Sequence, residues 1–221
     1  RLARFYGTVV KLAIANDWMH KNPFAGIRFQ EKEVIREVLT KEEIERMMCK
    51  EFALPRLEYV RDVFIFCVFT GMAYVDVNNL RQEHIVRDNN DDLWIRKARQ
   101  KTNNMCNIPL LKIPQLLMEK YKNHPLCTKT GALLPVPSNQ KMNSYLKEIA
   151  DFCGIQKNLT THTARHTFAT VVALANGVSM ENIAKMLGHS DIRMTQRYAK
   201  VMDSSIMRDM ENVDKLFKSS E

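Results

Sequence analysis

Residues 84–110 read HIVRDNNDDLWIRKARQKTNNMCNIPL, and this stretch decides the fold class. Three short apolar runs, at 84–86, 93–95 and 107–110, are separated by polar segments, and the turn-forming cluster 88–92 lies between the first two. Short apolar runs bounded by Asp and Asn are typical of strands joined by tight turns. The stretch therefore predicts a small antiparallel sheet within 84–110.

On both sides of this stretch the apolar residues recur at helical spacing. The chain has only 7 Gly and 7 Pro in 221 residues, too few for the frequent turns of an all-β fold. Thr40 and Glu43 have the spacing of a capping box at the start of one helix. We expect a mainly α protein with one small sheet, with helices near 1–20, 41–53, 57–70, a short one ending near Leu80, 112–123, 138–153, 162–175, 180–187, 191–199 and 203–217.

Composition narrows the class of protein further. The chain is 45% hydrophobic and has no apolar run approaching the ~18 residues of a membrane span, so we expect a soluble protein. Its five cysteines are odd in number, far apart and without a CxxC pair, which argues against a disulfide framework or a zinc ribbon and favours the reducing cytoplasm. A net charge of +8 makes a polyanionic partner such as nucleic acid plausible.

Charge also indicates how the chain is organised. Residues 1–30 hold five Lys or Arg and one acid, and the helical spacing there ends at Asn22-Pro23. Residues 31–39 are rich in Glu. We expect a basic helical element at 1–30, a linker at 31–39 and a separate domain at 40–221 that ends in the helix 203–217. Because the first residue is Arg1, we also expect the chain to be a fragment of a longer protein.

Four clusters could carry chemistry: Lys101-Thr102, the run 162–166 (HTARH), Leu187-Gly188-His189, and Tyr198. Each has an ordinary explanation when taken alone. The two histidines of 162–166 could form half a zinc site, but no ligand stands at metal spacing and no HExxH is present. The histidine after Gly188 could follow a helix C-cap, and Tyr198 could be a core residue.

A second interpretation covers residues 177–198 alone. The segment resembles a helix-turn-helix, with Ser179 as N-cap, a turn at Gly188 and a second helix from Ser190 that carries Arg193 and Arg197. The protein would then read DNA bases without catalysis. This alternative leaves the run 162–166 and Lys101 unexplained.

Phosphoryl transfer on DNA uses all four clusters. A phosphodiester can be cut without a metal if the protein supplies a nucleophile, cations for the non-bridging oxygens and a proton for the leaving oxygen. Arginine suits the second role because its rigid fork can hold two phosphate oxygens, and lysine can donate the proton. A tyrosine nucleophile would form a phosphotyrosine ester that conserves bond energy for rejoining.

The order Lys101, His162-x-x-Arg165, Leu187-Gly188-His189 and Tyr198 resembles the tyrosine recombinases of the phage-integrase family. The resemblance extends over residues 1–221. Asn22-Pro23-Phe24 resembles the end of that family's core-binding domain, and the segment 70–81 (TGMAYVDVNNLR) resembles its first catalytic box.

The resemblance implies roles for individual residues. Tyr198 is then the nucleophile, Arg165 and His189 bind the scissile phosphate, His162 assists proton transfer and Lys101 is the general acid. Two further residues would support the site, Asp76 and His166.

The resemblance also implies an activity and partners. The activity is site-specific DNA recombination through a 3′-phosphotyrosine intermediate, with a type IB topoisomerase as the closest enzymatic alternative. The partner is double-stranded DNA, on which the protein forms a homotetramer through the helix 203–217, whereas it is a monomer in free solution. No metal or nucleotide cofactor is expected, and the place of action is the bacterial cytoplasm, at the nucleoid when DNA is bound.

The sequence departs from the family at Ala73, where the first catalytic arginine is expected. Side chains alternate faces along a strand, so Arg99 would share a face with Lys101 and could supply the missing cation, whereas Arg96 would face away. The Arg-x-Lys-Thr arrangement without the first arginine resembles integrases of conjugative transposons. The alternative is a degenerate protein that binds DNA without cutting it.

Overall fold

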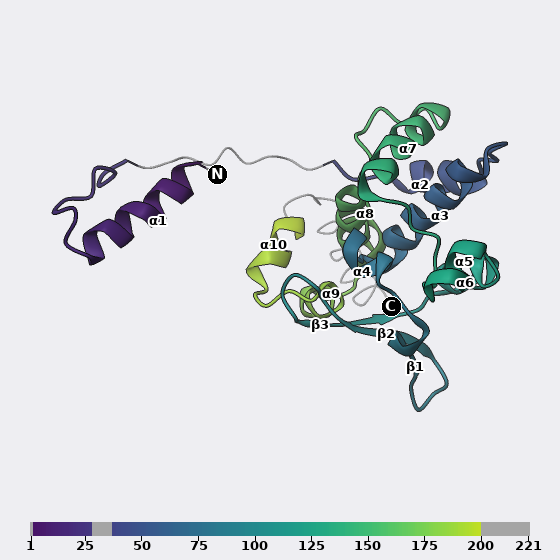
Figure 1. Ribbon diagram of the computed structural model, residues 1–221. Coiled ribbons are helices and arrows are strands. Elements are labelled where there is room, and N and C mark those ends of the chain that lie inside the picture. Colours follow the sequence, from purple (N-terminus) through teal and green to yellow (C-terminus); the bar gives the residue numbers. More distant parts are fainter. Residues whose placement is uncertain (1, 28–36, 200–221) are drawn as a thin grey trace, which may run out of the picture. The chain divides into compact units, whose positions relative to one another are not determined.

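The computed structural model describes residues 2–27 and 37–199, and the chain divides into two compact units, residues 1–35 and 36–221. The helix expected at 203–217 lies outside the described residues. The expected fold class is confirmed, since the elements are mostly helices with one three-stranded antiparallel sheet (Figure 1). No helix within these two ranges is long and apolar enough to cross a membrane.

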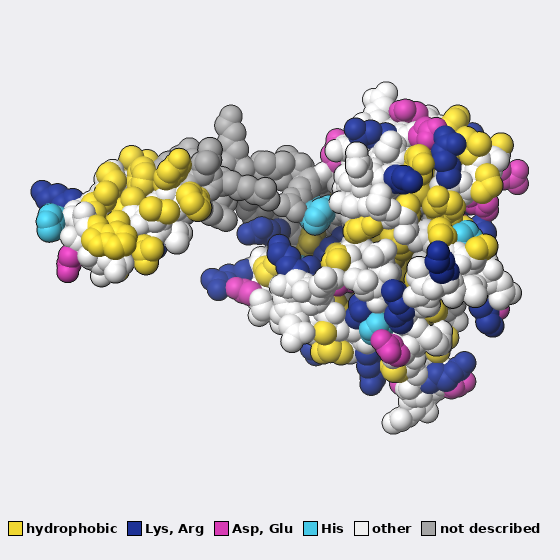
Figure 2. Space-filling model, in the orientation of Figure 1, with side chains coloured by type: hydrophobic (Ala, Val, Ile, Leu, Met, Phe, Trp, Pro, Cys, Tyr) yellow, Lys and Arg dark blue, Asp and Glu magenta, His cyan; other side chains and the backbone are white. Residues whose placement is uncertain are grey.

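The described part of the first unit, residues 2–27, contains one helix, α1 (Leu2–Ala15), which ends before the expected residue 20. Asp17 has a positive φ of 55° two residues after the helix ends. Large apolar side chains of this unit are exposed, including Phe5 at 65%, Leu12 at 60% and Trp18 at 76%. Figure 2 shows hydrophobic side chains gathered over this unit. A helix of this length cannot bury such a surface by itself.

The second unit is built around α3 (Pro55–Thr70), which is buried on nearly all sides. It packs against α2 (Lys41–Cys49), α5 (Lys112–Tyr121), α7 (Asn139–Phe152) and α8 (Thr161–Thr167). The predicted capping box of α2 is present, although the helix ends four residues earlier than expected. A short helix, α6 (Pro125–Thr130), was not predicted from the sequence.

The sheet has the order β1–β2–β3, from β1 (Ile85–Arg87), β2 (Leu93–Ala98) and β3 (Met105–Pro109). Ile95 pairs with Ile108, and both are buried, so one face of the sheet covers the helical core. Two predicted boundaries were wrong. His84 belongs to the turn η1 (Gln82–His84) and not to a strand, and the third strand begins at Met105 rather than at 107.

The segment after α8 is not the continuous α-helix expected over 162–175. It winds as a π-helix, η2 (Phe168–Ala173), followed by a 3-10 turn, η3 (Leu174–Asn176). Short π segments within helices are frequent at functional sites. Three more helices complete the unit: α4 (Tyr74–Asn78), α9 (Met180–Leu187) and α10 (Arg193–Ala199). In Figure 1, α9 lies beside β3, on which it packs.

Candidate active site

Arg165 lies at the meeting point of three helices and is only 6% exposed. Its Nη1 donates to the carbonyl of Gly71 at 2.6 Å, and its Nη2 donates to the carbonyl of Leu187 at 2.6 Å. These carbonyls stand at the ends of α3 and α9, where the helical ladder leaves them without a partner. Burial, and then the nearby charge of Arg99, lower the pKa of Arg165. The guanidinium is therefore fixed in position before any ligand arrives.

Both helix ends depend on a glycine. Gly71 and Gly188 have φ values of 67° and 60°, a region that glycine adopts without the strain of a Cβ. A Cβ at Gly71 would collide with Phe168 and Leu187. A Cβ at Gly188 would lie 2.6 Å from Cδ of Arg99 and 2.8 Å from Sγ of Cys106. Gly188 thus leaves room for the Arg99 side chain beside the end of α9.

His189 follows Gly188 directly and connects two helices. Its Nε2 lies 3.2 Å from Nη2 of Arg165, and its Nδ1 lies 2.8 Å from Oγ1 of Thr195 in α10. Burial, followed by the positive charges of Arg165 and Arg99, lowers the pKa of His189 to about 4. The imidazole is therefore neutral near pH 7 in the absence of an anion.

Tyr198 is 9% exposed and packs between two imidazoles. Its ring is stacked on His189, with 6.4 Å between centroids and 10° between planes, and is tilted against His166 at 5.4 Å. Tyr198 also belongs to the small core cluster around η2 and α9. His166 is itself 9% exposed, so the ring of Tyr198 is enclosed by buried side chains.

Arg99 reaches the site from a turn and not from a strand. Because β2 ends at Ala98, the prediction that Arg99 and Lys101 share a strand face was wrong. The turn is closed by the amide of Arg99, which donates to the carbonyl of Asn104 at 2.9 Å, and by the amide of Asn103, which donates to the carbonyl of Arg99 at 2.8 Å. The Arg99 side chain is nevertheless only 11% exposed, and its Nε is buried without a hydrogen-bond acceptor in the described part of the chain.

Asp76 and Asn104 hold this turn against the rest of the site. Oδ1 of Asp76 accepts from the amide of Gln100 at 3.0 Å, and Oδ2 lies 3.9 Å from Nε of Arg99. Nδ2 of Asn104 donates to the carbonyl of Gly188 at 3.2 Å. Asp76 is 5% exposed, so its carboxylate is a buried acceptor for this turn.

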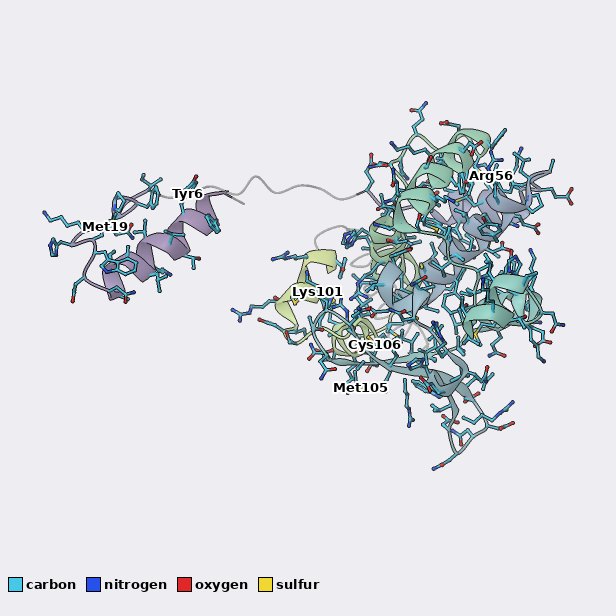
Figure 3. The ribbon with its side chains drawn as sticks, in the orientation of Figure 1. Tyr6, Met19, Arg56, Lys101, Met105 and Cys106 are labelled. Atoms are coloured by element: carbon cyan, nitrogen blue, oxygen red, sulfur yellow. The ribbon has the colours of Figure 1, made fainter. Side chains whose placement is uncertain are left out.

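Lys101 and His162 occupy solvent-exposed positions. Lys101 lies in the turn 100–102 between β2 and β3, where Figure 3 labels it together with Met105 and Cys106 of the following strand. His162 lies in the first turn of α8. The structure thus gathers six expected residues and leaves these two at the surface: the gathered set is Arg165, His189, Tyr198, His166, Arg99 and Asp76.

Three residues of the site were not predicted from the sequence: Thr195, Asn104 and Cys106. Cys106 is 7% exposed, and burial raises the pKa of its thiol. Thr195 has a spacing signal, since it precedes Tyr198 by three residues on the same helix face. Across the described residues no three His, Cys, Asp or Glu side chains are grouped so as to hold a metal ion.

The phage integrase family model matches residues 37–205 of this chain. Over 95 residues the chain is 40% identical to the tyrosine recombinase XerD of Staphylococcus saprophyticus, an alignment that covers 43% of this chain and 31% of that protein. Over 71 residues it is 42% identical to XerD of Staphylococcus aureus, covering 32% of this chain and 24% of the relative. The matched part is thus about a third or less of the length of these relatives.

Solved structures share the fold at low sequence identity. The Tn1549 transposon integrase in complex with circular intermediate DNA superposes with a TM-score of 0.68 at 19% identity, covering 95% of this chain and 76% of that one. A lambda integrase dimer bound to a COC′ core site gives a TM-score of 0.65 at 19% identity, covering 85% and 68%. Because the family model matches residues 37–205, which is more than half of the chain, the chain belongs to the phage integrase family of tyrosine recombinases.

Proposed function

We propose that this chain is the catalytic part of a site-specific DNA recombinase that cleaves and rejoins DNA through a 3′-phosphotyrosine intermediate. One observation carries the proposal: the phenol of Tyr198 stacks on His189, which is hydrogen-bonded to the buried guanidinium of Arg165. The nucleophile therefore contacts the imidazole, and the imidazole contacts the fixed cation. A DNA-binding protein without catalysis would not require this arrangement.

In the proposed reaction, Oη of Tyr198 attacks the scissile phosphorus and the P–O5′ bond breaks. His162 accepts the phenolic proton, and Lys101 gives a proton to the leaving 5′ oxygen, which departs as a hydroxyl. Rejoining reverses these steps with the same or another 5′ hydroxyl. Because the phosphotyrosine ester retains the energy of the broken bond, no nucleotide cofactor is required.

Arg165 and Arg99 hold the non-bridging phosphate oxygens in this proposal. The contacts of Arg165 to Gly71, Leu187 and His189 use only part of the five N–H groups of a guanidinium. Arg99 compensates for the alanine at position 73. What supports this is its buried Nε without an acceptor and its electrostatic effect on the pKa of Arg165.

The proposal extends to the organisation of the protein and its partners. Residues 1–30 would be the end of a core-binding domain, 31–39 the linker, and 40–221 the catalytic domain. Duplex DNA would lie against the catalytic domain, and the helix 203–217 would contact a neighbouring protomer in a tetramer on DNA, with a monomer free in solution. The protein would act in the bacterial cytoplasm, at the nucleoid when it is bound to DNA.

The helix-turn-helix alternative explains less of the site. The helices α9 and α10 flank Gly188 as that interpretation requires, and Arg193 and Arg197 are exposed. The same exposed arginines can contact DNA in a recombinase. The alternative gives no reason for the buried Arg165, which lies outside the motif.

A nicked suicide duplex tests the proposal. Cleavage near the nick releases a short strand that diffuses away, so the covalent intermediate accumulates. The chain is incubated with a library of such duplexes whose arms are randomised, and adducts are resolved on a denaturing gel. We expect adducts enriched in particular sequences with the wild type, none with Tyr198→Phe, and wild-type amounts with the control Tyr6→Phe, whose phenol is 53% exposed on the first unit.

Two other outcomes would overturn the proposal. Adducts formed without sequence preference would indicate a type IB topoisomerase. Sequence-selective binding with no adduct would indicate the helix-turn-helix regulator.

A further inference from the structure

Thr195 is fully buried, with 0% of its surface exposed, although it is a polar residue on the short helix α10. Its hydroxyl oxygen lies 2.8 Å from Nδ1 of His189. Burial of a hydroxyl costs free energy unless the group is hydrogen-bonded, so this contact accounts for the threonine at this position.

The partners of His189 determine which ring nitrogen carries the proton. Arginine can only donate hydrogen bonds, so Nε2, which faces Nη2 of Arg165 at 3.2 Å, must be the acceptor. In a neutral imidazole the proton is then on Nδ1, which donates it to Oγ1 of Thr195. The two hydrogen bonds together select one tautomer and one orientation of the ring.

We propose that Thr195 is a positioning residue, which holds the Nδ1–H of His189 so that Nε2 always points toward Arg165 and the phosphate position. This inference rests on the proposed function. The hydrogen bond from Nδ1 to Thr195 is the same in the neutral and the doubly protonated ring. When a phosphate binds, a proton from solvent can therefore add at Nε2 without any rotation of the ring. This proton replaces the hydrogen bond that Nε2 accepts from Nη2 of Arg165, so the imidazole and the guanidinium then both donate to the anion.

Thr195 also connects this histidine to the nucleophile. Thr195 and Tyr198 stand three residues apart on α10, so their side chains lie on one face of the helix. Thr195 is hydrogen-bonded to Nδ1 of the His189 imidazole, and the ring of Tyr198 stacks on the face of the same imidazole. Loss of the Thr195 hydroxyl would allow the His189 ring to rotate. The position of Tyr198 relative to Arg165 would then no longer be fixed.

Burial and the charged groups around His189 determine its pKa. Arg165 approaches from α8 and Arg99 from the turn after β2, and both oppose protonation of the ring. From α10 come Thr195 and Tyr198. Among the described residues no carboxylate shifts the pKa of this histidine, so in this proposal the phosphate is the anion that raises it.

The first test needs no activity. Side-chain 15N NMR of the full chain is recorded at pH 7 without DNA, and the His189 signals are assigned by their loss in His189→Gln. We expect a protonated Nδ1 and an unprotonated Nε2 in the wild type and in Thr195→Ser, and a mixture of tautomers in Thr195→Val. A proton on Nε2 in the wild type, or an unchanged tautomer in Thr195→Val, would overturn the inference.

The second test measures the rate of adduct formation against pH on sequences selected from the suicide library. Losing one hydrogen bond to a catalytic imidazole should slow Thr195→Val ~10-fold and move its pH profile, whereas Thr195→Ser should stay within ~3-fold of the wild type. Thr170→Val is the matched control, because Thr170 is 1% exposed and its hydroxyl bonds only the carbonyl of His166 among the described contacts. Wild-type rate and profile in Thr195→Val would contradict the inference. Absence of wild-type adducts would count against the proposed function instead, while the NMR result would still decide the tautomer.

Discussion

The site has a buried half and an exposed half, and they are built differently. Arg165, Asp76 and Thr195 are nearly inaccessible and are held by backbone carbonyls, a backbone amide and an imidazole. Lys101 and His162 are exposed at a turn and at a helix start. In the proposed mechanism, the phosphate clamp would therefore be organised before DNA binds, whereas the groups proposed to move protons would meet the DNA at the surface.

The largest effect is expected in the buried half, at Arg165→Lys. Lysine keeps the charge, but it cannot bond the carbonyls of Gly71 and Leu187 together because it lacks the planar fork. We expect adduct formation to fall ~10³-fold, together with a lower melting temperature. The control Arg87→Lys changes an exposed arginine paired with Asp91 and should alter neither quantity. Near wild-type cleavage by Arg165→Lys would mean that the buried guanidinium is not the clamp.

A comparable loss of rate, without any loss of stability, is expected in the exposed half. Lys101→Ala should slow cleavage ~10²- to 10³-fold because the leaving oxygen lacks its proton, while the unfolding free energy stays unchanged. A substrate with sulfur in place of the bridging 5′ oxygen has a leaving group that needs no proton, so it should restore the rate. If it does not, Lys101 is not the general acid.

Arg99→Ala tests whether this arginine serves in place of the one absent at position 73. Removal of one phosphate-binding cation should slow adduct formation ~10²-fold. Arg96→Ala is the matched control, since Arg96 is an exposed arginine of the preceding strand. Equal rates for the two variants would rule the substitution out.

A smaller effect is expected from Gly188→Ala, which tests the close packing of the Arg99 side chain against the backbone at the end of α9. The new Cβ would collide with Arg99 and Cys106, and alanine would have to adopt a positive φ. We expect the unfolding free energy to fall by ~2 kcal/mol and cleavage to become several-fold slower.

The control Gly177→Ala separates the two causes of that cost. Gly177 has a φ of 81° but no atom within 4 Å of an added Cβ, so it carries the backbone strain without the steric contact. Equal losses of stability and rate in both variants would show that the contact with Arg99 is unimportant.

The sequence indicates which residues form the buried half of the site, but it does not predict the secondary structure that carries all of them. Arg165, His189 and Tyr198 were grouped through the resemblance of their motifs to the tyrosine recombinases, and the structure places the three side chains in contact. The turn that carries Arg99 was misjudged as strand. Its closing residue Asn103 has a φ of 55°, which asparagine tolerates, and two adjacent asparagines were the available signal.

Other differences have separate physical reasons. The short helix α6 was missed although Pro125 at its start and Gly131 at its end are ordinary helix signals. The π-helix after α8 has no such signal, because its apolar spacing over six residues also fits an α-helix. Thr195 could not be identified from spacing alone, since its proposed role depends on His189, which lies in the connection between α9 and α10.

Identification of the residue that becomes linked to DNA tests the central claim most directly. Adducts trapped on the suicide library are digested with nuclease and trypsin, and the peptides are sequenced by mass spectrometry. The account predicts a nucleotide joined through its 3′ phosphate to Tyr198 and to no other residue. A nucleotide on another side chain, or one joined through a 5′ phosphate, would contradict it.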